Sequence, residues 1–284
     1  MSTISSALMR RLLNLYPLDI AHSQLMRLTY PFALPEGEVK LHVKAVSGPM
    51  CFDPNTFLGR HLYFMGTYEP ICLSRLRRTM KPGMVFYDIG ANVGLYSILA
   101  GKLVGEGGAV HAFEPQKKLV AQLKRNIASN GLSNVNIWEA ATSSEVKRDK
   151  LVQLSSTNTG QACLTHGDAE GLEQEEVSCV TLDSMVAEGK IPPCDVIKVD
   201  IEGAEHEALK GAEGILQERP PKAIFFECID EHLGRFNSSA EELIGFLSSL
   251  GYTLEYARRG KWKAFEKERY LADGSPPDFI ATMG

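Results

Sequence analysis

The stretch YDIGANVGLYSILA, residues 87–100, constrains the possible fold more than any other part of the chain. It overlaps the apolar run MVFYDI and places Gly90 and Gly94 on either side of Asn92. An apolar strand that ends in a glycine loop and then opens a helix is typical of α/β sheets that bind a nucleotide-like ligand. The ligand of this loop therefore decides most of the functional interpretation.

From residue 84 onward, short apolar runs alternate with amphipathic stretches of helical length. This alternation predicts an α/β fold with a largely parallel sheet and helices on both faces. The expected parallel strands are 84–89, 109–113, 135–138, 195–199 and 223–227. The expected helices are 94–103, 116–130, 205–217 and 240–252, and the late pieces 253–256 and 279–282 are expected to pair antiparallel at one edge. Ligands of such sheets lie outside the carboxyl ends of the strands, which is where the glycine loop falls.

Three classes of ligand use a strand, a glycine loop and a helix. The phosphate loop of nucleotide triphosphatases needs G-x-x-x-x-G-K-[ST], and residues 87–100 contain no lysine or arginine. The dinucleotide fingerprint has glycines where this chain has Asn92 and Tyr96, and both side chains argue against a pyrophosphate. S-adenosylmethionine carries no phosphate, so Gly90 and Gly94 only need to turn tightly past its ribose and methionine tail. Asp88, at the strand end, is well placed to meet the ammonium group of that tail.

A second acidic residue ends the next predicted strand. HAFEP, residues 111–115, contains Glu114, which follows Gly94 by the roughly 20 residues typical of a ribose-binding acid. The alternative is that Glu114 only stabilises the start of the helix that follows Pro115. Glu114 does not by itself separate S-adenosylmethionine from NAD, whereas the glycine loop does.

Several motifs along the chain carry a family resemblance. They are GTYEP at 66–70, KPGMVFYDIGANVGLYS at 81–97, VHAFEP at 110–115, NVNIWEAATSS at 134–144, NTG at 158–160, VTLDSM at 180–185, DVIKVDIEGAEHEALKGA at 195–212 and KAIFFE at 222–227. With these motifs the chain resembles the FkbM-type class I S-adenosylmethionine-dependent methyltransferases. The resemblance implies a Rossmann-like sheet of seven strands, the last antiparallel, in a methyltransferase domain over residues 61–284. Residues 1–60 lie outside it and are expected to form a helical or irregular extension that contacts substrate or a partner.

The resemblance also implies positions for the cofactor. They are Asp88, Gly90, Ala91, Asn92 and Glu114, and the loop adds Gly94. Glu69 in GTYEP matches an acid expected near the methionine end of the cofactor, or else it caps the following helix. Ala141 matches a small residue beside the adenine, or else it is small for packing.

Three acids are the candidates for the chemistry on the acceptor. Asp200, Glu202 and Glu227 follow the predicted strands 195–199 and 223–227 and should line one cleft. An oxygen acceptor must lose its proton, so Asp200 is the first choice for a general base or an acceptor contact. The position of Asp200 also matches the place where metal-dependent relatives hold magnesium, and a pair of carboxylates suits that ion. Glu202 has a simpler alternative, which is to stabilise the start of the next helix.

Histidines and one long connection give weaker signals. His206 is expected to be an ordinary helix residue, whereas His61 and His232 are open between a cleft position and a structural one. Residues 155–164, SSTNTGQACL, lie in a long polar connection that is either a lid over the acceptor or a surface loop.

These features favour an S-adenosylmethionine-dependent methyltransferase that acts on a hydroxyl of a small-molecule, sugar or glycan-like acceptor. The alternatives are an NAD-dependent oxidoreductase on a related sheet and a non-catalytic cofactor-binding module.

A formal net charge of −5, without a basic stripe, argues against a nucleic-acid partner. No segment has the roughly 20 apolar residues of a membrane span, and six cysteines without a C-x-x-C pair suggest reduced thiols and a cytoplasmic location. The oligomeric state leaves no signal in the sequence.

Overall fold

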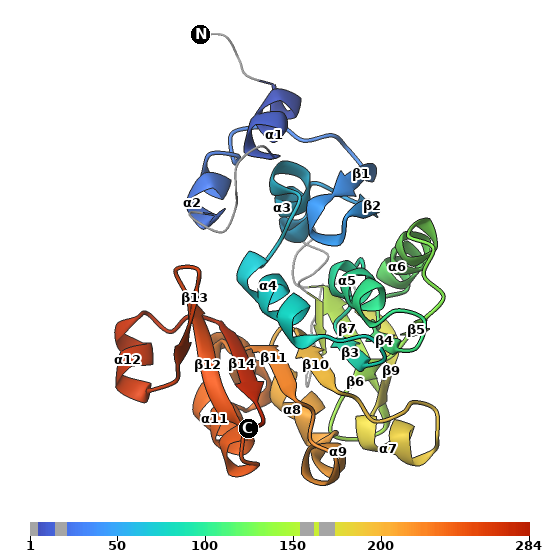
Figure 1. The fold of residues 1–284 in the computed structure, drawn as a ribbon, viewed down its shortest axis with the longest axis vertical. Helices are drawn as coiled ribbons and strands as arrows, with labels where there is room; N and C mark the ends of the chain where they lie inside the picture. The colour runs from blue at the N-terminus through green and yellow to red at the C-terminus, as the bar shows by residue number, and fades with distance from the viewer. Residues whose placement is uncertain (1–4, 15–21, 154–161, 165–173) are drawn as a thin grey trace.

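The structure is a computed structural model that describes residues 5–14, 22–153, 162–164 and 174–284. Its centre is an eight-stranded sheet in the order β13-β12-β14-β11-β10-β3-β4-β5 (Figure 1). Its strands are β3 (Val85–Ile89), β4 (Ala109–Phe113), β5 (Val135–Trp138), β10 (Val196–Val199), β11 (Ala223–Glu227), β12 (Thr253–Arg258), β13 (Lys261–Ala264) and β14 (Asp278–Thr282). The expected α/β architecture is therefore confirmed.

The direction of the strands places a ligand site between β3 and β10. β10 pairs with β3 and with β11 in parallel, and β3 pairs in parallel with β4. The chain runs outward from β3 to β4 and β5 on one side and later fills the other side with β10 and β11. This reversal of strand order opens a crevice at the carboxyl ends of β3 and β10.

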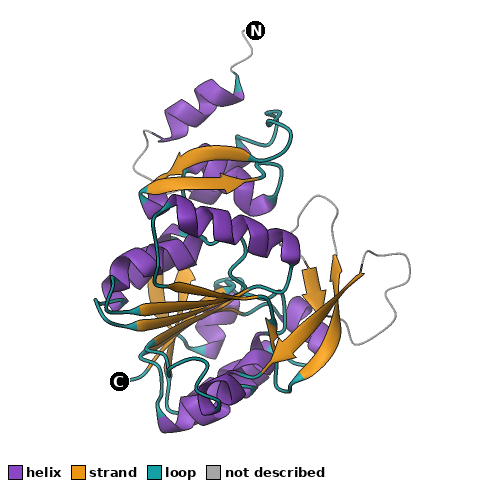
Figure 2. Ribbon diagram, turned by 90° about the vertical axis from the view of Figure 1, so that its right-hand side faces the viewer, coloured by secondary structure: helices purple, strands orange, loops and turns teal. Residues whose placement is uncertain are grey.

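Alternation of side chains along the strands divides the core into two layers. Phe86 and Val110 lie in the core layer under α4 (Pro70–Thr79), α5 (Leu95–Val104) and α6 (Lys117–Ser129). Tyr87 and Phe113 lie in the opposite layer, which is covered by α7 (Leu182–Ala187), α8 (Glu205–Lys210), α9 (Glu213–Glu218) and α11 (Ala240–Ser249). Figure 2 shows the sheet edge-on between these two layers of helices.

The N-terminal part adds a hairpin and short helices to one face. These elements are α1 (Ser6–Asn14), α2 (His22–Arg27), β1 (Val39–Val43), the 3-10 turn η1 (Lys44–Val46), β2 (Gly48–Phe52) and α3 (Phe57–Met65). β1 and β2 pair antiparallel, and Met50 and Phe52 share the core layer of α5 and α6. The Asn126 side chain accepts a hydrogen bond from the Cys51 N–H at 2.7 Å, and Lys102 donates to the Val46 carbonyl at 2.8 Å. The hairpin is therefore fixed to the helical layer.

A second, four-stranded sheet follows β5, where the sequence suggested an irregular stretch. It consists of β6 (Ala141–Thr142), β7 (Lys147–Gln153), β8 (Ala162–Leu164) and β9 (Gln174–Val180), in the order β6-β9-β7-β8. β7 has the sequence KRDKLVQ, in which Lys147 and Asp149 are half-buried and pair with each other at 3.4 Å. The first two inward positions of the strand are thus charged, so the alternation of apolar residues that marks a strand is missing there.

Two further differences concern one helix and one edge of the main sheet. The expected helix over 205–217 is divided into α8 and α9, with Gly211 and Ala212 between them. The main sheet has one strand more than expected, because β12 and β13 form an antiparallel hairpin at the edge. The expected antiparallel pair is formed by β12 and β14. The remaining elements are α10 (Asp230–Leu233), η2 (Gly234–Phe236) and α12 (Lys267–Ala272).

None of the helices in the described ranges combines the length and the apolar character that a membrane crossing requires.

Candidate functional site

Two adjoining pockets open at the carboxyl ends of the central strands. We call the first the Glu114 pocket, and it is lined by Ile89, Phe113, Glu114, Pro115, Gln116, Ala140, Ala141, Thr142, Leu151, Ile201 and Ala204. We call the second the acidic pocket, and it is lined by Phe57, Leu58, Tyr68, Asp88, Ala91, Leu95, Tyr96, Lys198, Glu227 and His232. Gly90, Asn92, Asp200 and Glu202 line both. The two pockets therefore form one continuous site around the glycine loop.

The glycine loop is held in place by the end of β4. The N–H groups of Gly90 and Ala91 both donate to the Phe113 carbonyl at 3.0 Å. Gly90 and Asn92 have positive φ angles of 82° and 50°. A Cβ atom on Gly90 would lie 2.0 Å from the backbone oxygen of Asp200, so the loops after β3 and β10 touch at this point. Gly94 begins α5 and lines neither pocket.

Replacing Gly90 by alanine is expected to lower the free energy of unfolding by about 2–5 kcal/mol. A left-handed φ costs an alanine about 1–2 kcal/mol, and forcing an extra methyl against fixed backbone costs about 1–3 kcal/mol more. Urea denaturation measures the sum. The matched control is Gly189→Ala, because Gly189 has a similar φ of 68° with nothing within 4 Å of the added Cβ. If both variants lost the same stability, the close contact with Asp200 would carry no energy.

Glu114 joins the glycine loop to the start of α6. Its side chain is 4% exposed, and its two oxygens accept hydrogen bonds from the Asn92 N–H at 2.9 Å and the Gln116 N–H at 3.0 Å. Burial raises the pKa of the Glu114 carboxyl to about 7. The bond to Gln116 supports the helix-start interpretation. The bond to Asn92 and the open pocket in front of the carboxyl allow a binding role as well.

Asp88 and Ala141 lie on opposite sides of the loop. Asp88 is buried in the floor of the acidic pocket, where the Ser97 hydroxyl donates to it at 2.5 Å. Burial raises the pKa of Asp88. Ala141 is buried in β6, on the wall of the Glu114 pocket.

A buried lysine lies at the centre of the acidic pocket. Lys198 is 6% exposed, donates to Asp200 at 2.8 Å and lies 4.4 Å from the centre of the Tyr96 ring. Burial lowers the pKa of Lys198, but the carboxylates of Asp200 and Glu69 outweigh it and raise the pKa overall. The Tyr96 hydroxyl donates to Glu69 at 2.5 Å. The Glu69 side chain makes no capping bond to α4, so it bonds the Tyr96 hydroxyl and not the helix start.

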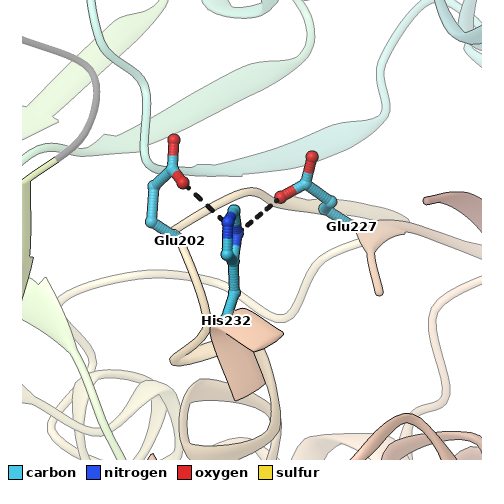
Figure 3. Close-up of side chains that lie close together, drawn as sticks. All are labelled: Glu202, Glu227 and His232. Carbon is cyan, nitrogen blue, oxygen red and sulfur yellow. Dashed lines mark ion pairs between the residues drawn. The ribbon is translucent and has the colours of Figure 1, made fainter. Parts of the chain in front are cut away.

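The third feature of the acidic pocket is a histidine between two glutamates (Figure 3). His232 Nδ1 lies 3.4 Å from a Glu202 oxygen and 3.5 Å from a Glu227 oxygen. Burial, followed by the charge of Asp200, raises the pKa of Glu202 to about 7 and that of Glu227 to about 10. At the start of the next helix it is Glu205 that accepts hydrogen bonds from the backbone, from the N–H groups of Ile201 and Gly203.

His206 and His61 line neither pocket. His206 Nδ1 shares a hydrogen bond of 2.6 Å with the Ser238 hydroxyl, and the ring packs on Phe246. His61 is buried against Tyr68 and bonds the Phe57 carbonyl at 2.9 Å. Of the possible lid, residues 155–161, including the NTG motif at 158–160, lie outside the described residues, and 162–164 form β8.

Comparison with known proteins decides the family. Residues 88–254, more than half of the chain, match the family model described as the methyltransferase FkbM domain. The chain belongs to this family. The resemblance of the sequence motifs to FkbM-type enzymes is therefore confirmed, and the NAD-dependent oxidoreductase is set aside.

Several FkbM-type and related proteins are similar to this chain. The 31-O-demethyl-FK506 methyltransferase FkbM of Streptomyces tacrolimicus is 26% identical over 209 residues, covering 63% of this chain and 74% of that protein. The hexuronic acid methyltransferase AglP of Haloferax volcanii is 25% identical over 150 residues, covering 53% of this chain and 56% of that protein. The crystal structure of methyltransferase FkbM from Methylobacillus flagellatus KT matches at 14% identity and a TM-score of 0.43, covering 78% of this chain and 52% of that one. The chain thus spans little more than half of these last two proteins.

Sequence reasoning missed three residues of this FkbM-family chain that the structure places in or next to the site. They are Tyr96, Lys198 and Asp278, which line one small recess with Glu69. Lys198 had a usable signal, because it precedes Asp200 by two positions and side chains two apart share one face of a strand. Asp278 had none, since it begins β14, far away in the sequence.

Proposed function

We propose that this methyltransferase transfers the methyl group of S-adenosylmethionine to a hydroxyl of a small-molecule, sugar or glycan-like acceptor. The observation that carries the proposal is the arrangement of three carboxylates, Asp200, Glu202 and Glu227, around a pocket that adjoins the glycine loop. The names of two relatives, a demethyl-FK506 methyltransferase and a hexuronic acid methyltransferase, support an oxygen-rich acceptor of this kind.

The Glu114 pocket is the proposed place for the adenosine half of the donor. Glu114 would accept hydrogen bonds from the ribose hydroxyls, and the small Ala141 leaves room for the adenine beside β6. The loop of Gly90, Ala91 and Asn92 would run along the ribose. Gly94 would fix where α5 begins, behind this loop. Acidic groups on both sides of this loop favour a ligand without phosphate, because two carboxylates would repel a pyrophosphate.

The methionine half would enter the acidic pocket. Asp88 offers a buried carboxylate for the ammonium group, and Glu69 adds negative charge behind Tyr96 and Lys198. A positive sulfonium also suits this surplus of carboxylates. The reacting methyl group would then face Asp200, which lines both pockets.

The transfer itself is an in-line displacement. A lone pair of the acceptor oxygen forms the new O–C bond, the C–S bond breaks with its electron pair going to sulfur, and the hydroxyl proton passes to a carboxylate. Positioning supplies much of the acceleration, and proton removal supplies a further part. Asp200 is the proposed base, since Lys198 fixes its carboxylate at the junction of the two pockets.

We also propose that residues 1–60 form an extension that contributes to acceptor binding, next to a methyltransferase domain over residues 61–284. Phe57 and Leu58 support this division of roles, because they line the acidic pocket and Phe57 is 50% exposed. An exposed aromatic ring beside a polar cleft suits the apolar face of a sugar or a macrocycle.

Calorimetric titration of the full chain with S-adenosylmethionine, S-adenosylhomocysteine and NAD tests the donor site. We expect binding of the first two ligands and none of NAD. Binding of NAD alone would contradict the interpretation of the loop, and absence of all binding would reject the proposed function.

The affinity for S-adenosylhomocysteine is expected to rise with pH up to about pH 7 and then level off. The pKa of Glu114 is raised to about 7, so below that pH the free carboxyl is protonated. Hydroxyl donors favour its ionised form, so binding must release the proton and weakens by up to about tenfold for each pH unit below 7. Titrations between pH 5.5 and 8.5, in buffers of different ionisation enthalpy, measure both the affinity and the proton release. A flat profile would separate Glu114 from the ribose.

A further inference from the structure

The cluster of Glu202, Glu227 and His232 has the geometry of an ion site. Each residue offers one ligand atom, and the three atoms lie within 4.8 Å of one another. The separations of 3.4 and 3.5 Å between His232 Nδ1 and the two carboxylates are too long for good hydrogen bonds. Within the part of the chain that the structure describes, this buried nitrogen has no hydrogen-bond partner. A nitrogen aimed between two carboxylates, without bonding either, points to a shared ligand.

The backbone holds these three side chains from separate elements. Glu202 follows β10, Glu227 ends β11, and His232 lies in α10. Glu202 has a left-handed φ of 57°, which is uncommon for a residue with a side chain. The next residue, Gly203, lies so close to the His232 backbone that a Cβ would meet its oxygen at 2.2 Å. The loops that carry two of the ligand atoms are therefore packed directly on each other.

The charges around the cluster also favour a cation. Asp200 and Glu205 add negative charge next to Glu202 and Glu227, while Lys198 bonds Asp200 and Arg235 lies near Glu202. A divalent ion would offset this concentration of negative charge.

We propose that Glu202, Glu227 and His232 bind one divalent first-row transition-metal ion, and that this ion holds the acceptor oxygen. The second half of this statement rests on the proposed function. A tetrahedral ion at about 2.0–2.2 Å from each ligand atom holds those atoms about 3.3–3.6 Å apart. The two separations from His232 Nδ1, 3.4 and 3.5 Å, already fall in this range, so small side-chain rotations complete the site. The imidazole ligand favours Fe²⁺ or Zn²⁺ over Mg²⁺, and the two carboxylates also suit Mn²⁺, which serves as a spectroscopic probe. The site differs from the magnesium pair suggested by the sequence, because Glu227 and His232 join Glu202 as ligands and Asp200 keeps its bond from Lys198.

Titration of the chelator-treated full chain with Mn²⁺, followed by electron paramagnetic resonance, tests the site without an acceptor. We expect one bound ion per chain, with nitrogen modulation from the His232 imidazole in pulsed spectra. Glu202→Gln and His232→Gln should each weaken binding by at least about 100-fold, because losing even an outer-shell partner costs 10–100-fold. Glu106→Gln and His42→Ala, which remove exposed side chains of the same types far from the site, should bind Mn²⁺ like the parent.

Two outcomes would overturn the metal site. One is that the chain binds no stoichiometric Mn²⁺. The other is that both cluster variants bind Mn²⁺ as tightly as the parent chain. Thermal unfolding of the two variants is measured in parallel to check that they are folded. Calorimetry with S-adenosylhomocysteine on the metal-free chain separates this result from the donor site. If that ligand binds and Mn²⁺ does not, the proposed function stands and His232 only lies beside the two glutamates without a shared ion. If Mn²⁺ binds and the donor does not, the ion site stands alone and its link to an acceptor is lost.

Discussion

Replacing Asp200 by asparagine is expected to lower the turnover number by about 10²–10⁴-fold while leaving donor affinity nearly unchanged. This range is the usual contribution of a positioned general base. The asparagine keeps the volume and one oxygen for the bond from Lys198, but it no longer takes a proton from the acceptor. The measurement is transfer of a labelled methyl group from S-adenosylmethionine to a panel of hydroxyl compounds that includes hexuronic acids, together with calorimetry of S-adenosylhomocysteine.

The matched control for this variant lies near the other end of β10. Asp195→Asn alters an aspartate that also pairs with a lysine, Lys222, and whose side chain is 31% exposed against 30% for Asp200. It should change stability slightly and turnover not at all. Normal turnover of Asp200→Asn would remove Asp200 from the proton transfer and leave Glu202 and Glu227 as the candidates.

Replacing Glu114 by glutamine should weaken S-adenosylhomocysteine binding at pH 8 by about 10–150-fold. A hydrogen bond to a charged group contributes about 1.5–3 kcal/mol, which corresponds to this range. The amide also turns an NH₂ group toward a backbone N–H, either of Asn92 or of Gln116, so the loop loses one acceptor. The variant cannot ionise, and the pH dependence of binding below pH 7 should therefore disappear.

Calorimetry across the same pH range checks both effects. Glu106→Gln, on the exposed turn after α5, should retain the affinity and the pH profile of the parent chain. Unchanged binding in Glu114→Gln, with an unchanged profile, would assign Glu114 to the helix start alone.

Local patterns were enough to predict most of the main sheet. Strands such as β3, VFYDI, and β11, AIFFE, are buried on both faces, and each is an apolar run with one acidic residue near its carboxyl end. The second sheet escaped prediction because β7 and β9 are rich in charged residues and their pairing is non-local. The β12–β13 hairpin was missed for a similar reason, since KWKA is short, polar and lies on the edge.

The candidate site was predictable where a functional residue lies at the carboxyl end of a strand. Asp88, Glu114, Asp200 and Glu227 all come at or directly after the carboxyl end of a predicted strand, which fixes their place in the crevice. The pairing of Glu69 with Tyr96, or of His232 with two glutamates, depends on side-chain directions from separate elements. No periodicity in the sequence encodes such a contact.

The close approach of Gly203 to the backbone of His232 has a consequence for redesign of this enzyme. A Cβ added at Gly203 would lie only 2.2 Å from the neighbouring carbonyl oxygen, so the segments after β10 and β11 fit together as a matched pair. If only one of the two segments were replaced by that of a homologue, the new segment would not fit the backbone of the segment that stays. Attempts to change the acceptor preference should therefore exchange residues 200–204 and 228–233 together, as one transplanted unit.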